Sequence, residues 1–256
     1  MISVIIPNYN RKELLLKAIR SCLQQTYRPI EVIVVDDGSN YDIKNYIKIN
    51  FSNDYESGLL KVFINEKNFG AAKSRNIGVG KSNGNYISFL DSDDYWESKK
   101  LDKQIDKFKK NLNLDLVYCD QYLLIDGVKM SSNKKMINSN ILNELINGWT
   151  APNTSTLMYR KESFERVGGF DEKLKSCQDH DLWFKIAREN FNIDYVDEPL
   201  SYFVIDSVDR MSYHLENRMD GVMMFLYNVK NYVPQKKYLF FKKKYIFKTS
   251  FPLFVN

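Results

Sequence analysis

The chain contains 256 residues, of which 44% are hydrophobic and 27% are charged. That length and balance are typical of a globular, enzyme-sized domain with one substantial core. No stretch approaches the roughly 18 to 20 unbroken apolar residues of a membrane-spanning helix, and the N-terminal residues MISVIIP lack the basic region of a secretory signal. We expect a cytoplasmic protein that is soluble or peripheral at the inner face of the membrane.

The net charge of +5 comes from one end of the chain. Seven of the 37 basic residues and none of the 32 acidic residues follow Gly221. The three cysteines form no C-x-x-C pair and have no histidine at a zinc-ligand spacing, which indicates reduced cytosolic thiols. We expect Cys22 and Cys119 to pack as small core residues.

Four short runs rich in Val and Ile occupy the first 90 residues, each roughly 25 to 30 residues after the last. Such runs are typical of strands buried on both faces of a sheet. Helical patterns lie between them, with one apolar stripe from Leu14 to Leu23 and a shorter one from Gly70 to Val79. This alternation predicts an α/β fold with a mainly parallel, Rossmann-like sheet flanked by helices. The expected strands are residues 3–7, 31–39, 59–65 and 85–90.

The pattern changes after Asp120. We expect residues 1–120 to form a nucleotide-binding half and residues 121–220 an acceptor and catalytic half, followed by a basic, aromatic tail at 221–256. The later strands are expected at residues 116–125 and 154–160, and residues 128–140 are polar and predict a loop. Helices are expected at residues 141–148, at 161–171 with a stop at Gly168-Gly169, and at 179–190.

Polar clusters follow each of the first four predicted strands. In open parallel sheets, ligands bind beyond the carboxyl ends of the strands. One such cluster is equally typical of a plain turn, but four at successive strand ends favour a single binding crevice. The clusters are Asn8-Tyr9-Asn10, Asp36-Asp37-Gly38-Ser39, Asn68-Phe69-Gly70 and Asp91-Ser92-Asp93-Asp94.

The last cluster crowds three carboxylates, which repel one another unless they are protonated, hydrogen-bonded or neutralised. Oxygen ligands on a loop suit Mg²⁺ or Mn²⁺ held together with a substrate diphosphate. Asp94 alone could instead cap the following helix. Arg75, on the helix after the third strand, suits phosphate oxygens but could equally form a surface salt bridge.

Five motifs occur in a fixed order along the chain, namely SVIIPNYNR, VVDDGS, NFGAAKSRNIG, FLDSDD, and GGFDE followed by QDHDLWFKIA. With these motifs the chain resembles the family-two inverting glycosyltransferases of GT-A fold, from about Ser3 to Ser212. The resemblance implies a nucleotide-diphosphate sugar as donor and a DxD motif that binds Mn²⁺ or Mg²⁺. The motifs say far less about which sugar is transferred.

The resemblance also implies roles for individual residues. Asp179 matches the catalytic base, and Asp93, the last residue of the DxD, matches the metal ligand. Asp91 matches the aspartate that contacts the ribose, and Asp37 would accept a hydrogen bond from the ring N–H of the base. The other residues expected at the nucleotide sugar are Pro7, Tyr9, Asn10, Asn68, Arg75, Ser92 and Arg210, the last on a segment that closes over the donor.

Two departures from the family pattern affect these assignments. Gln178 stands where Glu is more common before the catalytic Asp, and it can hydrogen-bond but carries no charge. The expected histidine after a later strand is missing, so His214 or Asp206 would serve as a second metal ligand. His214 could equally be a surface or packing residue, His180 is expected to pack, and Asp179 could also act as the N-cap of its helix.

We therefore predict a metal-dependent inverting glycosyltransferase of hexosyl or N-acetylhexosaminyl type, using a UDP-sugar in polysaccharide or lipid-linked oligosaccharide biosynthesis. The acceptor would be a hydroxyl of a glycan or lipid-linked molecule. One alternative is a nucleotide-sugar binding module without turnover, against which the presence of Asp93 and Asp179 argues. A second alternative is a nucleotidyltransferase, which normally has a basic, glycine-rich loop near the first strand, whereas PNYNRKELL contains none.

The basic tail is predicted to dock on an anionic membrane surface. Lysines near such a surface contribute binding energy, and aromatic rings settle at the interface. Alternatively, the tail is a helical appendage whose aromatic residues pack on the catalytic domain or on a second subunit. Nucleic acid is disfavoured as a partner, because the rest of the chain offers no basic face to extend the patch.

Overall fold

The computed structural model of the chain describes residues 1–132, 141–147, 151–205 and 215–250. The chain divides into two compact units. Unit 1 comprises residues 1–136, 152–169 and 191–206, and unit 2 comprises residues 137–151, 170–190 and 207–256. The expected division of the chain at residues 120 and 220 stays a prediction.

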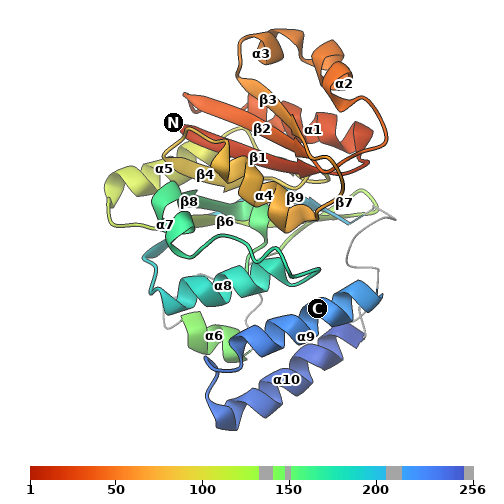
Figure 1. Cartoon of the computed structure of the whole chain (residues 1–256). Helices are drawn as coiled ribbons and strands as arrows, with labels where there is room; N and C mark the ends of the chain where they lie inside the picture. The colour runs from red at the N-terminus through yellow and green to blue at the C-terminus, as the bar shows by residue number, and fades with distance from the viewer. Residues whose placement is uncertain (133–140, 148–150, 206–214, 251–256) are drawn as a thin grey trace. The chain divides into compact units, whose positions relative to one another are not determined.

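Unit 1 is built on one sheet whose described strands run in the order β3-β2-β1-β4-β8-β6-β9-β5, with β7 paired to β6 (Figure 1). The strands β3, β2, β1 and β4 are parallel neighbours, whereas β8 pairs antiparallel with both β4 and β6. The expected parallel sheet is thus found in the first half of the chain and becomes mixed beyond it. The strands are β1 (Ile2–Asn8), β2 (Ile30–Asp36), β3 (Leu60–Ile64), β4 (Tyr86–Phe89), β5 (Tyr95–Trp96), β6 (Leu116–Ile125), β7 (Val128–Ser131), β8 (Leu157–Arg160) and β9 (Ile193–Val204).

Helices connect these strands and cover the sheet. All seven residues of β1 and of β2 are buried, as their mainly apolar sequences predict. The polar pair inside these strands is satisfied internally, because Ser3 donates to Glu31 over 2.6 Å. On α4, a Cβ added at Gly78 would lie 2.4 Å from Cγ2 of Ile5, so only glycine lets this helix approach β1 so closely. The helices of unit 1 are α1 (Lys12–Leu23), α2 (Ile43–Asn50), α3 (Ser52–Glu56), α4 (Ala71–Gly80), α5 (Lys100–Lys110), the 3₁₀ turn Thr154–Thr156 and α7 (Lys161–Arg166).

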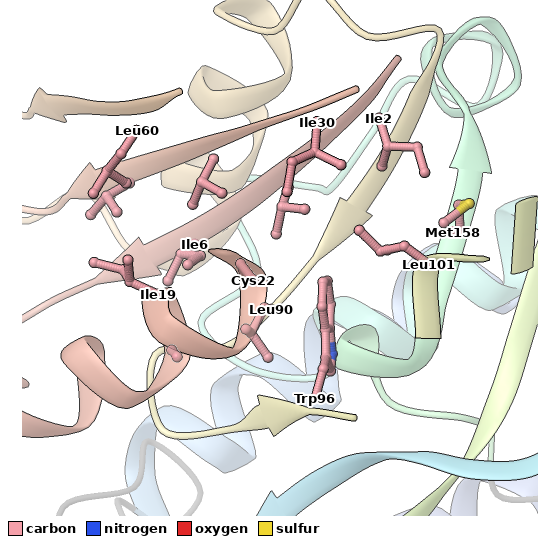
Figure 2. Close-up of a cluster of buried hydrophobic side chains, with 14 of the residues drawn as sticks. Ile2, Ile6, Ile19, Cys22, Ile30, Leu60, Leu90, Trp96, Leu101 and Met158 are labelled. Carbon is pink, nitrogen blue, oxygen red and sulfur yellow. The ribbon is translucent and has the colours of Figure 1, made fainter. Parts of the chain in front are cut away.

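A hydrophobic cluster in unit 1 joins the sheet to its helices (Figure 2). Ile19 and Cys22 of α1 and Leu101 of α5 share this cluster with side chains of β1, β2 and β3, and with Leu90 directly after β4. Cys22 and Cys119 are both buried, as expected, and burial raises the pKa of their thiols to about 12 and about 11. They remain protonated near neutral pH and pack as small apolar residues.

One local prediction in unit 1 is wrong. Residues 128–140 were expected to form a loop, but Val128–Ser131 is the strand β7, which pairs antiparallel with the end of β6. All four of its residues are exposed. The strand does alternate apolar and polar residues, but over only four positions within a polar segment, which was interpreted as a loop. Residues 133–140 lie outside the described part of the chain.

Unit 2 is helical in its described residues, with α6 (Ile141–Asn147), α8 (Gln178–Arg188), α9 (Leu215–Val229) and α10 (Gln235–Ser250) (Figure 1). Aromatic rings join three of these helices. The ring centroid of Phe225 on α9 lies 5.4 Å from that of Phe184 on α8 and 6.4 Å from that of Phe241 on α10. None of the helices in the described residues has the length and hydropathy needed to cross a bilayer.

Candidate active site

The four polar clusters follow the four parallel strands at one edge of the sheet. The chain runs outward from β1 to β2 and β3, and it then returns to β4 on the other side of β1. Such a switch point is where open α/β sheets leave a crevice for ligands. Hydrogen bonds and ion pairs join the four clusters to one another, and each link can be named.

The first link joins the ends of β1 and β2. The side-chain amide of Asn8 donates to Asp36 over 2.7 Å, and the backbone N–H of Asn10 donates to Oγ of Ser39 over 2.8 Å. Ser39 in turn donates its hydroxyl to Asp36 over 2.6 Å. Burial raises the pKa of the nearby Tyr41, so its hydroxyl stays neutral and accepts from Asn8 over 3.2 Å. At this end of the site, the carboxylate of Asp36 is therefore surrounded by neutral hydrogen-bonding side chains.

The second link joins β2 to the loop after β3. The carboxylate of Asp37 is 3% exposed and accepts three hydrogen bonds. The donors are the side-chain amide of Asn65 at 2.8 Å and the backbone N–H groups of Phe69 at 2.9 Å and Gly70 at 2.7 Å. Gly70 has a φ of +94°, a conformation that side chains rarely adopt, so glycine is required to present its N–H in this way. Asp37 thereby fixes the start of α4.

The third link joins α4 to the end of β4. Arg75, buried on α4, donates from Nη2 to Oδ1 of Asp91 over 2.5 Å. The salt bridge considered for Arg75 is thus formed, but its guanidinium is buried at the strand ends and does not lie on the surface. A guanidinium in this place matches the planar oxygens of carboxylates and phosphates alike.

The fourth link closes the ring between β1 and β4. Arg11, directly after the β1 cluster, places Nη1 2.6 Å from Oδ2 of Asp93. The side chain of Asp93 is largely buried, whereas that of Arg11 is 24% exposed. The proposed metal ligand thus has a guanidinium as its counter-ion, and this pair spans the switch point of the sheet.

Oxygen atoms of Asp91, Asp93 and Asp94 lie within 4.8 Å of one another. Carboxylate oxygens coordinate Mg²⁺ or Ca²⁺ at about 2.0 to 2.6 Å, so oxygens at this spacing fit a divalent cation between them. The oxygens of Asp94 are each engaged, Oδ2 by the hydroxyl of Ser155 at 2.7 Å and Oδ1 by the backbone N–H of Val204 at 3.2 Å. Asp91 and Asp93 are therefore the better candidates for ligands.

Asp94 does not cap a helix, contrary to the alternative considered from the sequence. The helix α5 begins at Lys100, and Asp94 is instead tied to Ser155 and to the end of β9. Ser155 also accepts from the backbone N–H of Asp91 over 3.1 Å, and its carbonyl accepts from Nε1 of Trp96 over 2.8 Å. Through these bonds Ser155 fixes the position of the acidic loop, residues 91–94.

A buried lysine supports the same loop. Nζ of Lys100 donates to Ser88 over 3.2 Å and to Gln104 over 2.8 Å, and it lies 3.9 Å from the centroid of the Trp96 ring. Burial lowers the pKa of Lys100 to about 8. The amine, which solvent does not reach, ties α5 to β4 and to β5, the two strands that flank the acidic loop.

The other residues expected at the nucleotide sugar are distributed as follows. Pro7 is buried at the end of β1, Ser92 is buried in the acidic loop, and Tyr9, Asn10 and Asn68 are exposed at the strand ends. Arg210 and His214 lie outside the described residues, as does Asp206. Their expected roles stay predictions.

Asp179 belongs to unit 2, where it is the second residue of α8. The N-cap is Cys177, with a φ of +60°, so the N-cap role considered for Asp179 is wrong. The Asp179 side chain is 40% exposed, and Oδ1 accepts from the backbone N–H of His180 over 2.9 Å. The ring of His180 packs 5.4 Å from that of Tyr245, as expected, and its Nδ1 also lies 3.2 Å from Oδ1 of Asp179. Gln178 is buried and donates to the carbonyl of Leu174 over 2.9 Å.

The model of the family described as Glycosyl transferase family 2 matches residues 3–168. The chain belongs to this family. Curated relatives described as uncharacterized glycosyltransferases support the assignment. Those of Rickettsia prowazekii and Rickettsia typhi are each 35% identical over 201 residues, which cover 73% of this chain and 59% of theirs. One from Haemophilus influenzae is 30% identical over 215 residues, covering 79% of this chain and 67% of its own. The chain thus spans about three fifths of the Rickettsia relatives.

Solved structures of glycosyltransferases show the same fold. Staphylococcus aureus TarS 1–349 in complex with UDP-GlcNAc superimposes with a TM-score of 0.75 at 23% identity, covering 98% of this chain and 73% of that one. The mannosyltransferase PcManGT of Pyrobaculum calidifontis, in complex with GDP-Man and Mn²⁺, gives 0.68 at 17% identity, covering 90% and 64%. The expected α/β fold of GT-A type is confirmed.

Sequence reasoning missed three residues that organise the site. Arg11 appears in the first motif, but its pairing with Asp93 depends on the adjacency of β1 and β4. Asn65 lies at the end of the third apolar run, and no motif in the sequence indicated that its side-chain amide donates to Asp37. Ser155 lies 61 residues from the carboxylate that it supports, so no local pattern joins the two.

Proposed function

We propose that this member of the family is an inverting glycosyltransferase that moves a sugar from a nucleotide-diphosphate donor, a UDP-sugar, to a hydroxyl of a glycan or lipid-linked acceptor. The observation that carries the proposal is the closed ring of four polar clusters at the strand ends of unit 1. Two guanidinium groups and three carboxylates meet there. This is the charge arrangement that a nucleotide diphosphate and a divalent cation need together.

The donor would lie across the strand ends. Tyr9, Asn10 and Asn68 would offer an exposed aromatic ring and amides to the base. Asp37 would accept from the ring N–H of the base with the acceptor site that its three hydrogen bonds within the protein leave. Arg11 and Arg75 would turn from the carboxylates to the diphosphate oxygens when the donor arrives, because a guanidinium binds either anion through parallel hydrogen bonds. Asp91 and Asp93 would be left to hold Mn²⁺ or Mg²⁺, which neutralises the leaving diphosphate.

Asp179 would act as the base. An inverting transfer needs one carboxylate to take the proton of the acceptor hydroxyl as its oxygen attacks the anomeric carbon. Asp179 is held by the backbone N–H of His180 and keeps 40% of its side chain exposed, so it can meet an acceptor. No covalent intermediate is required, and an α-linked donor gives a β-linked product.

A panel of nucleotide sugars tests this function. Slow hydrolysis by water identifies a donor before the acceptor is known, so the full chain is incubated with UDP- and GDP-linked hexoses and N-acetylhexosamines, each with Mn²⁺, with Mg²⁺ and with EDTA. We expect cleavage of one UDP-sugar that depends on the cation. Donor binding with no turnover towards any acceptor would favour a binding module, and full activity in EDTA would contradict the metal role.

The stereochemistry of the product gives an independent test. Proton NMR of the new anomeric centre should show a β linkage from an α-linked donor. A retained α linkage would contradict single displacement with Asp179 as the base.

A further inference from the structure

The helix α10 presents two different faces. Its sequence, QKKYLFFKKKYIFKTS, contains six lysines and no acidic residue. Phe241 is buried, with its ring centroid 5.7 Å from that of Phe184 on α8, and Tyr245 lies 5.0 Å from Phe225 on α9. These two aromatic residues pack within unit 2, as the appendage alternative expected.

The opposite face carries large apolar side chains in contact with solvent. Leu239 and Phe240 are each 68% exposed. Lys236 and Lys243 are exposed too, and the four residues follow the spacing i, i+3, i+4 and i+7 that places side chains along one side of a helix. We call these four residues the outer stripe. It consists of an apolar pair between two positive charges.

The apolar and basic side chains of the outer stripe together indicate which class of partner can bind it. Leucine and phenylalanine side chains gain by leaving water, whereas the lysines need anionic groups within reach. An anionic lipid surface offers both, with phosphates at the headgroup level and an apolar layer directly beneath. Nucleic acid would satisfy the lysines and could stack on Phe240, but it offers no apolar layer for Leu239.

A second copy of the chain fits the outer stripe less well. In a two-fold symmetric contact the same patch meets itself. The lysines of the two stripes would then lie against each other, and α10 has no acidic residue to pair with them. The charge of the stripe therefore favours lipid over self-association.

We propose that the outer stripe of α10 docks the protein on an anionic lipid surface, with Leu239 and Phe240 among the headgroups and Lys236 and Lys243 against the phosphates. The inference rests on α10 alone and not on the proposed reaction, so vesicle binding and sugar transfer can fail separately. Docking would bring the protein to the surface where a lipid-linked acceptor resides.

Co-sedimentation of the full chain with phosphatidylcholine vesicles, with and without phosphatidylglycerol, tests the proposal. We expect binding only to the anionic vesicles and a decrease with added salt. The double variants Leu239→Ser/Phe240→Ser and Lys236→Gln/Lys243→Gln should each lose most of the binding. Because these side chains point into solvent, both variants should melt at the temperature of the parent.

The helix α2 supplies matched controls. It carries Ile49, which is 72% exposed, together with the exposed lysines Lys44 and Lys48. Ile49→Ser and Lys44→Gln/Lys48→Gln make the same chemical changes elsewhere and should bind vesicles as the parent does. Equal binding to neutral vesicles, or equal loss in the α2 and α10 variants, would overturn the proposal. So would a parent dimer in light scattering that the α10 variants convert to monomers without any vesicle binding.

Discussion

The carboxylates at the end of β2 and those at the end of β4 have different partners. Asp36 and Asp37 accept hydrogen bonds from amides, a hydroxyl and backbone N–H groups, all of them neutral donors. Asp91 and Asp93 are paired with the guanidinium groups of Arg75 and Arg11. The same residue type at the same edge of one sheet thus meets two kinds of environment.

The difference separates structural carboxylates from exchangeable ones. Backbone N–H groups cannot leave Asp37 without moving the loop before α4, so that carboxylate braces the fold. A guanidinium can turn to another anion, and a cation can take its place on the carboxylate. We expect substitutions at the β4 end to affect chemistry first and those at the β2 end to affect stability first.

The largest effect is expected for Asp93→Asn. This substitution removes the charge that holds the cation, so Mn²⁺-supported transfer should be abolished while the circular dichroism spectrum stays that of the parent. Transfer and Mn²⁺ binding by isothermal titration are both measured. Asp106→Asn on α5, an exposed aspartate, is the control and should change neither. Retained Mn²⁺ affinity in Asp93→Asn would place the metal elsewhere.

Asp179→Asn tests a carboxylate of unit 2. The Asp179 side chain is partly exposed and accepts a hydrogen bond from the backbone N–H of His180. We expect turnover to fall by about 10²- to 10⁴-fold, the usual contribution of a general base. Donor affinity and melting temperature should stay unchanged. If calorimetry shows donor binding lost together with activity, Asp179 binds the donor or supports the fold and does not act as the base.

The sequence predicted those elements whose burial leaves a continuous apolar run. The strand at Leu116–Ile125 has the predicted limits, and the limits of β1, β2, β3 and β4 differ from the prediction by at most three residues. The strand β7 was missed because its alternation of apolar and polar residues is only four residues long and all four are exposed. Local patterns predict where a segment is buried, and they predict poorly where only backbone hydrogen bonds hold it.

The candidate site was predicted as a set of strand ends, but its internal pairing was not. Asp94 was a plausible helix cap by local spacing, yet its partners lie 61 and 110 residues away. The pairing of Arg11 with Asp93 requires β1 and β4 to be neighbours, which the order of the strands along the chain does not reveal. Contacts of this kind follow from topology and not from sequence motifs.

The comparison of the two strand ends is sharpened by Asp37→Asn and Asp91→Asn. In Asp37→Asn an amide NH₂ replaces an acceptor that faces buried N–H donors, which should lower the free energy of unfolding by about 1 to 3 kcal/mol. Asp91→Asn removes the charge of a carboxylate that is 30% exposed but keeps an oxygen that can accept from the buried Arg75, so we expect a loss of about 0 to 1 kcal/mol. Urea denaturation measures both. Equal losses would mean that the two carboxylates brace the fold alike.

The smallest effect is expected for Arg11→Met, and its sign is the informative part. If Arg11 competes with the cation for Asp93, its removal should strengthen Mn²⁺ binding in the absence of donor. A pair whose arginine is 24% exposed is worth at most about 1 kcal/mol, which corresponds to about a fivefold change in affinity. Electron paramagnetic resonance of free Mn²⁺ during a titration measures this change directly. Affinity for the nucleotide diphosphate should fall in the same variant, because the guanidinium is then missing from the phosphates.

Lys12→Met is the matched control for this titration. Lys12 is the next residue along the chain, and its Nζ lies 4.6 Å from the ring of Tyr46 and not at the acidic loop. The control removes one positive charge from the same segment but leaves the pair with Asp93 intact. Only Arg11→Met should therefore tighten Mn²⁺ binding. An equal increase in Mn²⁺ affinity in both variants would mean that the effect comes from the lost positive charge and not from the pair with Asp93. Weaker Mn²⁺ binding in Arg11→Met would show that the guanidinium orients Asp93 for the cation instead of opposing it, and the β4 carboxylates would then be braced in the same sense as those of β2.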